Sequence, residues 1–407
     1  MALIKRKLFN RMANMMLLIL VLLQAPLPFA QDQSSIFSKR LAKFSINVYT
    51  KLVAQNSNQN IIFSPFSIQT CAAMARMGAK GKTAAQLDRG LKLISNNEAQ
   101  IAESFHKVLA AYEKSSILHI ANKIYIKAGY QLRDKFSSII FKKFLSAVEP
   151  IDFSEDVRAA EKINSWVALR TNNLIKDIVD SSKLTASTRL LLINAIHFKG
   201  NWVHQFPERD TGNEPFYGNT DKSIDVPMMN LKKRFRYATL DNLNATALEL
   251  RYKDSDLSML IVLPNSKTGL AQLERKLRIT PLSQITEKLD WRDVIVKLPK
   301  FKSEFEVELK HTFKQLGMSD MFSNDADFSR MITTSERLKV SKIIHKAVIE
   351  VNEKGTEAAA ATASIIVGFS LPSLPREPKR FYADHPFNYY IINKQSIMLF
   401  AGKLINP

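Results

Sequence analysis

A run of nine almost wholly apolar residues at 190–198, LLLINAIHF, constrains the fold of this chain more than any other segment. A strand with one face in solvent alternates apolar and polar residues, whereas this run suits a strand covered on both faces, in the middle of a sheet. Further strands are expected at 257–263 and 294–296, and a hairpin at 387–404. Helical periodicity dominates before residue 180, so helices early and strands late predict an α+β fold. The expected helices cover 37–52, 67–77, 82–91, 98–112 and 155–176.

The first thirty residues form a separate element. A basic start, from Lys5 to Arg11, precedes a short apolar run at 15–23 and a small residue, Ala30. This order is typical of a secretory signal peptide. A membrane anchor is the alternative, but the run is shorter than the ~20 apolar residues that span a bilayer. We therefore expect a signal peptide at 1–30, a single domain at 31–407, secretion to the extracellular space and no membrane span.

Exported proteins can form disulfides and carry N-linked glycans, so two residues of this chain become informative. Cys71 is the only cysteine, so the chain has no internal disulfide, and its apolar neighbours favour a buried, inert thiol over a nucleophile. Asn244 begins the triplet Asn-Ala-Thr, an acceptor for N-glycosylation in an exported protein. The sequence therefore predicts a secreted glycoprotein without disulfides.

The charge of the chain is strongly positive, with 58 Lys and Arg residues against 38 Asp and Glu, a formal net charge of +20. A basic surface favours polyanions such as glycosaminoglycans, although short charge clusters are more often solvated surface. The clusters lie at 142–143, 232–236 and 376–380. No nucleic-acid reader motif accompanies the charge, so nucleic acid is not an expected partner.

Signatures of the common enzyme classes are absent. The chain lacks a Gly-x-Ser-x-Gly elbow, a His-Glu-x-x-His pair, a phosphate-binding glycine loop and a dinucleotide fingerprint. Its seven histidines lie too far apart for a sequence-local metal motif. We therefore expect no enzyme, no cofactor and no metal. An unrecognised hydrolase stays open, because a catalytic triad can assemble from distant residues.

Five segments of the chain carry motifs of one protein family: 62–68, 194–202, 345–359, 384–387 and 402–407. Taken together and in this order, they resemble the serpin family over essentially the whole mature chain. The resemblance implies three β-sheets with surrounding helices, a monomer and an exposed reactive loop at about 355–385. It also implies that a serine-type protease attacks this loop as a substrate and forms a covalent acyl-enzyme, after which the loop inserts into the central sheet and distorts the protease.

The segment that would insert has a composition suited to a strand within a sheet. Alternate side chains from Thr356 to Ile366 are uncharged, and none is proline, which a central strand excludes. An alanine-rich surface helix is the alternative before cleavage. A non-inhibitory serpin that binds a ligand or a polyanion is the alternative function, and such members typically carry bulky, charged or proline residues in the hinge. The hinge here is Gly355, Thr356, Glu357, Ala358, Ala359, Ala360, Ala361 and Thr362.

The resemblance also assigns residues that control the opening of the sheet. One polar group would lie beneath the centre of the sheet and exchange partners as the strands separate. Another would lie at its top, where insertion begins. A satisfied core histidine is the simpler interpretation of His345 taken alone. In the group at the top, Glu353 could pair with Lys300, or both side chains could equally be solvated. The assigned residues are Ser64, Ser67, Asn194 and His345 beneath the sheet and Trp202, Lys300 and Glu353 at its top.

The reactive bond follows from a spacing in inhibitory members, where the residue before the cut lies sixteen positions after the glutamate that matches Glu353. This spacing predicts cleavage between Phe369 and Ser370. A large aromatic residue before the cut favours a chymotrypsin-like protease.

One departure from the family pattern leaves other bonds open. The stretch from Phe369 to Pro386 is about six residues longer than usual, so cleavage at Leu371 is possible on this spacing. Cleavage at Arg376 or Arg380 would instead imply a trypsin-like target. Cleavage at Arg380 would lengthen the inserted segment well beyond the customary span.

Overall fold

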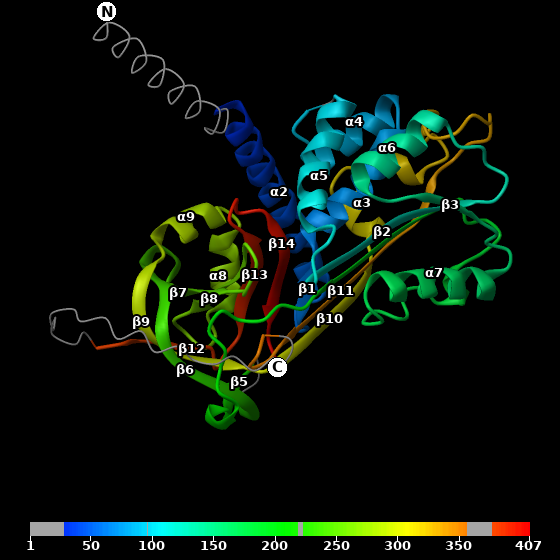
Figure 1. The fold of residues 1–407 in the computed structure, drawn as a ribbon. Helices are drawn as coiled ribbons and strands as arrows, with labels where there is room; N and C mark the ends of the chain where they lie inside the picture. The colour runs from blue at the N-terminus through cyan, green and yellow to red at the C-terminus, as the bar shows by residue number, and fades with distance from the viewer. Residues whose placement is uncertain (1–27, 96, 219–222, 356–376) are drawn as a thin grey trace, which may run out of the picture.

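The computed structural model describes residues 28–95, 97–218, 223–355 and 377–407, with side chains from residue 35 onward (Figure 1). Its helices are α2 Pro28–Gln55, α3 Pro65–Gly78, α4 Gly81–Gly90, α5 Glu98–Tyr112, α6 Asp134–Phe144, α7 Asp156–Arg170, α8 Leu270–Leu277, α9 Leu282–Lys288 and α10 Lys310–Gln315. Its strands are β1 Ile61–Phe63, β2 Leu118–Lys127, β3 Val148–Ile151, β4 Leu190–Phe198, β5 Gly212–Tyr217, β6 Ser223–Leu240, β7 Ala245–Arg251, β8 Leu257–Pro264, β9 Asp290–Pro299, β10 Phe301–Glu308, β11 Val340–Val351, β12 Lys379–Tyr382, β13 Phe387–Asn393 and β14 Met398–Leu404.

A five-stranded sheet, in the order β10-β11-β4-β2-β3, lies at the centre of the fold. The apolar run that the sequence predicts as a central strand is β4, and every residue of it is buried. Leu192 and Ile196 point into the main core with α3, whereas Leu191 and Ile193 pack beneath α7 on the opposite face. Because both faces are covered, the strand has no polar alternation.

Nine strands form a second sheet, in which β5 joins the path β1-β14-β13-β8-β7-β6-β9-β12. The resemblance implies three sheets, and two of them are continuous here because the 18-residue strand β6 pairs on both sides. It pairs with β9 over residues 228–237 and with β7 over residues 236–240. The expected α+β class is confirmed.

The helix expected at 155–176 is shorter in the structure, where α7 ends at Arg170. Asn172 and Asn173 follow with φ of 50° and 60°, in the left-handed region that asparagine tolerates better than most residues. Helical periodicity did not reveal this stop, because the apolar spacing continues past the turn.

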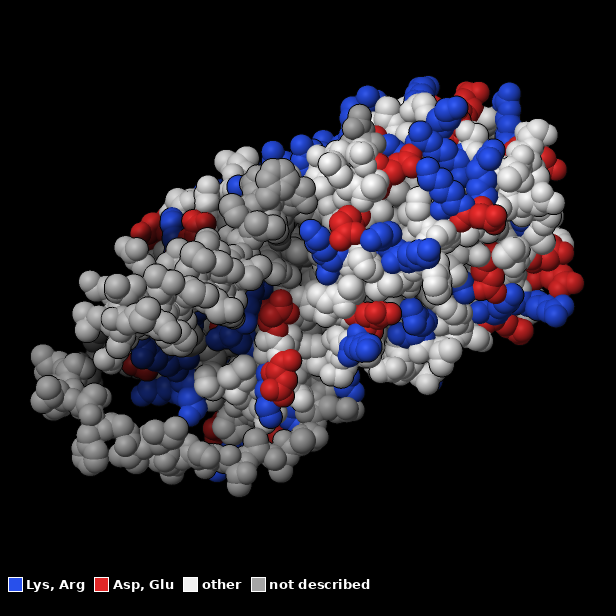
Figure 2. All heavy atoms as spheres, turned by 45° about the horizontal axis from the view of Figure 1, so that its top comes forward, with Lys and Arg blue, Asp and Glu red and all other residues white. Residues whose placement is uncertain are grey.

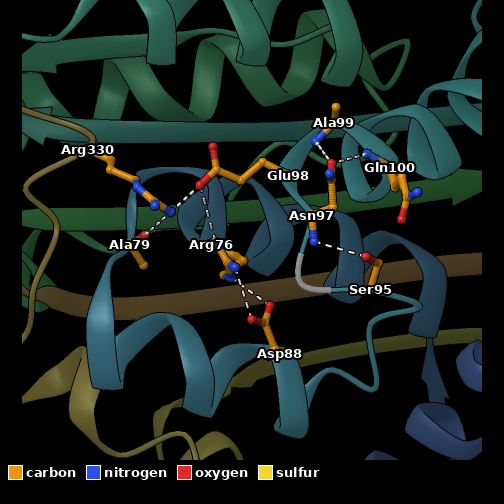
Figure 3. A network of polar contacts seen from close by, with 9 residues as sticks. All are labelled: Arg76, Ala79, Asp88, Ser95, Asn97, Glu98, Ala99, Gln100 and Arg330. Atoms are coloured by element: carbon orange, nitrogen blue, oxygen red, sulfur yellow. Dashed lines mark hydrogen bonds and ion pairs between the residues drawn. The ribbon is translucent and has the colours of Figure 1, made fainter.

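Three helices over one end of the five-stranded sheet are joined by Arg76, a residue of α3 (Figure 3). Its guanidinium is buried and donates to both carboxylate oxygens of Asp88 in α4, at 2.6 and 3.0 Å. It also pairs with Glu98 of α5 at 3.9 Å, and Glu98 in turn pairs with Arg330. A buried cation needs such partners, so this network fixes α3, α4 and α5 relative to one another.

The start of the chain is only partly within the described residues. The apolar run of the predicted signal peptide lies outside them, and α2 begins at Pro28, two residues before the predicted cleavage site. Within the described part, no helix is long and apolar enough to cross a membrane. Cys71 in α3 is free and buried, with its Sγ 3.6 Å from the carbonyl oxygen of Ile193 in β4. Burial raises the pKa of this thiol far above its usual range, as expected of an inert cysteine.

Candidate functional site

A tight turn at residues 352–355 directly follows β11 and closes with a hydrogen bond from the Gly355 amide to the Asn352 carbonyl, at 3.1 Å. Gly355 has a φ of 102°, a backbone conformation that residues with a Cβ rarely adopt. A Cβ on Gly355 would lie 2.2 Å from the carbonyl oxygen of Gly200 and 2.6 Å from the Trp202 amide. The first residue of the expected hinge is therefore packed against the backbone that follows β4, where only glycine fits.

Trp202 holds this turn from the side of β4. Its backbone amide donates to the Lys354 carbonyl at 3.0 Å, and its indole Nε1 donates to the Asn352 carbonyl at 3.0 Å. The ring is buried and stacks on Tyr252, with ring centroids 4.4 Å apart. The C-terminal ends of β4 and β11 are thereby joined at the end of the five-stranded sheet where the expected hinge begins.

Glu353 adds an ionic contact to the same turn. One carboxylate oxygen lies 3.0 Å from Lys300 Nζ, and the other accepts a hydrogen bond from Thr211 Oγ1 at 3.0 Å. Burial alone would raise the pKa of Glu353, but hydrogen bonds from a backbone amide, Lys300 and Thr211 outweigh burial and lower it. The ion pair expected from the resemblance is present, with Glu353 buried and Lys300 half-buried.

The four polar residues expected beneath the sheet come together around Asn194 of β4. The side-chain nitrogen of Asn194, Nδ2, donates to Ser67 Oγ at 2.5 Å, and the side-chain oxygen, Oδ1, accepts from His345 Nδ1 of β11. The other ring nitrogen, Nε2, accepts from the backbone amide of Ser64 at 3.2 Å. Ser64 also caps α3, because its Oγ accepts from the Ser67 amide at 3.1 Å.

A fifth member of this cluster, Asn122 of β2, was missed by the sequence analysis. Its Oδ1 accepts hydrogen bonds from Ser67 Oγ, at 3.0 Å, and from the Asn194 amide. The antiparallel register of β2 and β4 sets Asn122 opposite Asn194. The segment LHIANKIYIK also contains His119, Lys123 and Lys127, so Asn122 does not stand out in it. Its partner depends on the register of the pairing.

The ring of His345 is neutral in this environment. Burial lowers its pKa to about 3, and an unprotonated Nε2 is what allows it to accept from the Ser64 amide. The register of β11 and β4 pairs His345 with Asn194, so the two residues lie opposite each other on adjacent parallel strands. Any strand that entered between β11 and β4 would separate them.

Several predicted residues fall outside the described part of the chain. These are the hinge residues from Thr356 to Thr362, the predicted bond between Phe369 and Ser370, and the alternatives Leu371 and Arg376. Among the residues that the structure does describe, no group of three His, Cys, Asp or Glu side chains could hold a metal ion.

Known proteins resemble this chain over nearly its whole length. A profile of the serpin family, described as serpin (serine protease inhibitor), matches residues 39–407. Serpin B4 of Homo sapiens is 37% identical over 391 residues, which cover 91% of this chain and 99% of that protein. The structure of cleaved Serpin 42Da shares 52% identity at a TM-score of 0.84, covering 92% of this chain and 99% of that one. The structure of native protease nexin-1 with heparin shares 29% identity at a TM-score of 0.80, covering 92% and 100%.

The chain therefore belongs to the serpin family, the family of serine protease inhibitors. The resemblance stated from the sequence is confirmed, and the fold is the serpin fold. In the described part of the five-stranded sheet, β4 and β11 are directly paired, without a strand between them.

Proposed function

We propose that this serpin inhibits a serine-type endopeptidase of chymotrypsin-like specificity, which cleaves between Phe369 and Ser370 and is trapped as a covalent acyl-enzyme. The direct parallel pairing of β4 and β11 carries this proposal. Because the chain turns back at Gly355, a following strand that entered between them would be antiparallel to both. It would replace one parallel ladder with two antiparallel ones, which are slightly more stable per residue.

The free energy available from insertion is large enough to deform a protease. Fifteen residues from 355 to 369 extend about 50 Å as a strand. A gain of roughly a dozen net hydrogen bonds at about 1 kcal/mol each contributes on the order of 10 kcal/mol. This is comparable with the whole stability of a typical domain, about 5–15 kcal/mol.

The position of Arg380 argues against cleavage at that residue. Arg380 lies inside β12, where it pairs with Ile295 of β9. A protease binds its substrate backbone in an extended form along its cleft, so cleavage there would first require β12 to leave the sheet. Phe369, which the family spacing favours, is therefore the better candidate.

A matched pair of hinge variants tests the mechanism. If the chain enters a sheet, Ala358 faces the packed interior and Ala359 faces the other side, since side chains alternate along a strand. With chymotrypsin, the wild type and Ala359→Arg should form an SDS-stable complex, whereas Ala358→Arg should be cleaved as a substrate and leave the protease active. Equal effects of the two substitutions would contradict insertion.

Two further measurements separate the alternatives. Phe369→Ala should abolish complex formation with chymotrypsin, while Arg376→Ala should leave it intact. If Arg376→Ala instead abolishes a complex with trypsin that Phe369→Ala leaves intact, the target is trypsin-like. A wild-type protein that every protease simply cleaves, with no rise in melting temperature afterwards, would favour a non-inhibitory, ligand-binding serpin.

We also propose that the protein is secreted after removal of residues 1–30. The basic start and short apolar run of this segment support export. N-terminal sequencing of protein from the medium of eukaryotic cells should find Gln31 as the first residue. Retention of the full chain inside the cell would contradict this proposal.

A further inference from the structure

Strands β6, β9 and β12, at one end of the nine-stranded sheet, have a buried face and an exposed face. The register places Lys232 of β6 and Arg380 of β12 on either side of Ile295 of β9, all on the exposed face. Arg234 lies two residues further along β6 on the same face. Neighbouring strands are about 4.8 Å apart, so the Cα atoms of Lys232 and Arg380 lie about 10 Å apart. The side chains on the buried face are Leu231, Phe235, Val294, Val296 and Phe381.

Lys232, Arg234 and Arg380, which we name the outer patch, are exposed, and none of them forms an ion pair with another described residue. A fourth cation of this face, Lys297, is already neutralised by Glu214 at 2.6 Å. Asp293 lies opposite Arg234 in the register and offsets one of the three positive charges. The region of the outer patch therefore keeps a net positive charge.

The outer patch lies within reach of any protease that engages the predicted bond. Arg380 is eleven residues after Phe369, and eleven extended residues span at most about 40 Å. A protease of about 230 residues has a radius of gyration of about 17 Å, and hence a diameter of roughly 45 Å. A protease bound at Phe369 can therefore reach the surface formed by β12 and its neighbours.

We propose that the outer patch is a docking surface for an acidic region on the target protease, beside the protease's active-site cleft. The proposal rests on the proposed function, because it concerns the protease that the loop captures. Complementary charge raises the rate of encounter and orients the protease toward the loop before the acyl bond forms. The target is thus a serine-type protease with carboxylates near its cleft.

An acidic protein surface fits the outer patch better than a sulfated polysaccharide. Ile295, half-buried between Lys232 and Arg380, offers an apolar contact of the kind that protein interfaces place among arginines. A polyanion chain would need a continuous row of cations, but Asp293 interrupts the row here and Glu214 already occupies Lys297.

The test uses one protease in two charge states, chymotrypsin and chymotrypsin whose surface lysines have been succinylated. Figure 2 shows basic side chains over the helices too, and these provide a charge-matched control away from the outer patch. The test variant is Lys232→Glu/Arg234→Glu/Arg380→Glu. The control is Lys107→Glu/Lys135→Glu/Lys142→Glu, which makes the same charge change on exposed residues of α5 and α6. Melting temperatures verify that both fold, and Lys232→Gln/Arg234→Gln/Arg380→Gln replaces a test variant that does not.

At 50 mM salt, the wild type and the control variant should form the covalent complex about tenfold faster with succinylated than with unmodified chymotrypsin. The test variant should lose this preference, and the wild type should lose it in 500 mM salt, where screening is nearly complete. Equal rates for the two proteases, or equal losses in both variants, would overturn the proposal. Heparin binding that the test variant alone loses, with no effect of succinylation, would overturn it in favour of a polyanion site.

A docking measurement keeps the two proposals apart. Succinylated chymotrypsin with its catalytic serine converted to alanine cannot acylate, but it can still bind the surface. Binding that depends on the outer patch, without any covalent complex from the active enzyme, would reject inhibition and keep the docking surface. A covalent complex that forms at the same rate in the wild type and the test variant would support inhibition and reject the docking surface.

Discussion

His345 Nε2 accepts a hydrogen bond from the backbone amide of Ser64, 3.2 Å away, although the two residues are 281 positions apart in the chain. The bond requires a neutral ring, since a protonated imidazole has no acceptor. The junction between α3 and the five-stranded sheet is therefore sensitive to acid.

The first prediction concerns this sensitivity. The pKa of His345 is about 3 in the folded protein, against about 6.5 in an unfolded chain. A depressed pKa stabilises the fold fully above pH 6.5, and the stabilisation is lost as the pH falls from there toward 3. Between pH 6.5 and 4.5, the free energy of unfolding should fall by about 1 kcal/mol per pH unit on account of this residue.

Urea denaturation at several pH values checks the expected slope. His345→Gln should remove the contribution of this residue, because an amide can donate and accept as the neutral ring does but does not titrate. His197, whose pKa burial lowers to about 4, should retain its own share of the slope in the wild type and in His345→Gln. A wild-type stability that is flat between pH 7 and 4.5 would refute the argument.

The second prediction concerns the hinge glycine. Gly355→Ala should destabilise the uncut protein by about 1–3 kcal/mol or more, because it combines an unfavourable backbone conformation with contact against the backbone at Gly200. Gly129 has nearly the same φ, 98°, but nothing lies within 4 Å of a Cβ built on it. Gly129→Ala should therefore cost only the backbone term, about 1–2 kcal/mol, and less than Gly355→Ala. Equal melting temperatures for the two variants would show that the contact at Gly355 is relieved by a small movement.

The third prediction concerns the acidic residue of the same turn. Glu353→Ala leaves Lys300 and Thr211 without their acceptor, and it should lower the stability of the uncut protein by about 1–3 kcal/mol. The control is Glu208→Ala, which removes an exposed ion pair with Lys354 at 3.1 Å and should cost less than about 1 kcal/mol. Thermal melting before and after loop cleavage measures both. The prediction fails if the two substitutions cost the same.

The fourth prediction concerns glycosylation. Asn244 is exposed at the end of a short 3-10 turn, and its Oδ1 accepts from Asn265 at 3.0 Å while no described residue bonds its Nδ2. The nitrogen that would carry a glycan is thus accessible. Protein secreted from eukaryotic cells should lose mass on enzymatic deglycosylation, and both Asn244→Gln and Thr246→Ala should abolish that loss. An unchanged mass in the wild type would contradict the prediction.

What the sequence could predict depended on how local the signal was. The bounds of β4 were predicted to the residue, because burial on both faces gives an uninterrupted apolar run between polar neighbours. The end of α7 was not, because the left-handed Asn172 and Asn173 stop the helix without a glycine or proline to mark the place. The family resemblance supplied the cluster around Asn194, but Asn122 was missed since its role depends on strand register.

The charged contacts were the least predictable part. Arg76 meets Asp88 and Glu98 only because three helices pack together, and nothing in the spacing of these residues along the chain indicates it. The outer patch has the same origin, since Lys232 and Arg380 become neighbours only through β9. Long-range pairing of this kind is a property of the sheet and not of any segment.

The single thiol of this chain, that of Cys71, is a natural probe for the opening of the core around it. Cys71 lies behind β4 with its sulfur against the Ile193 carbonyl, so a thiol reagent reaches it only when that strand and α3 move apart. With one cysteine in 407 residues, labelling kinetics followed by mass spectrometry would time the movement of that strand without an engineered probe.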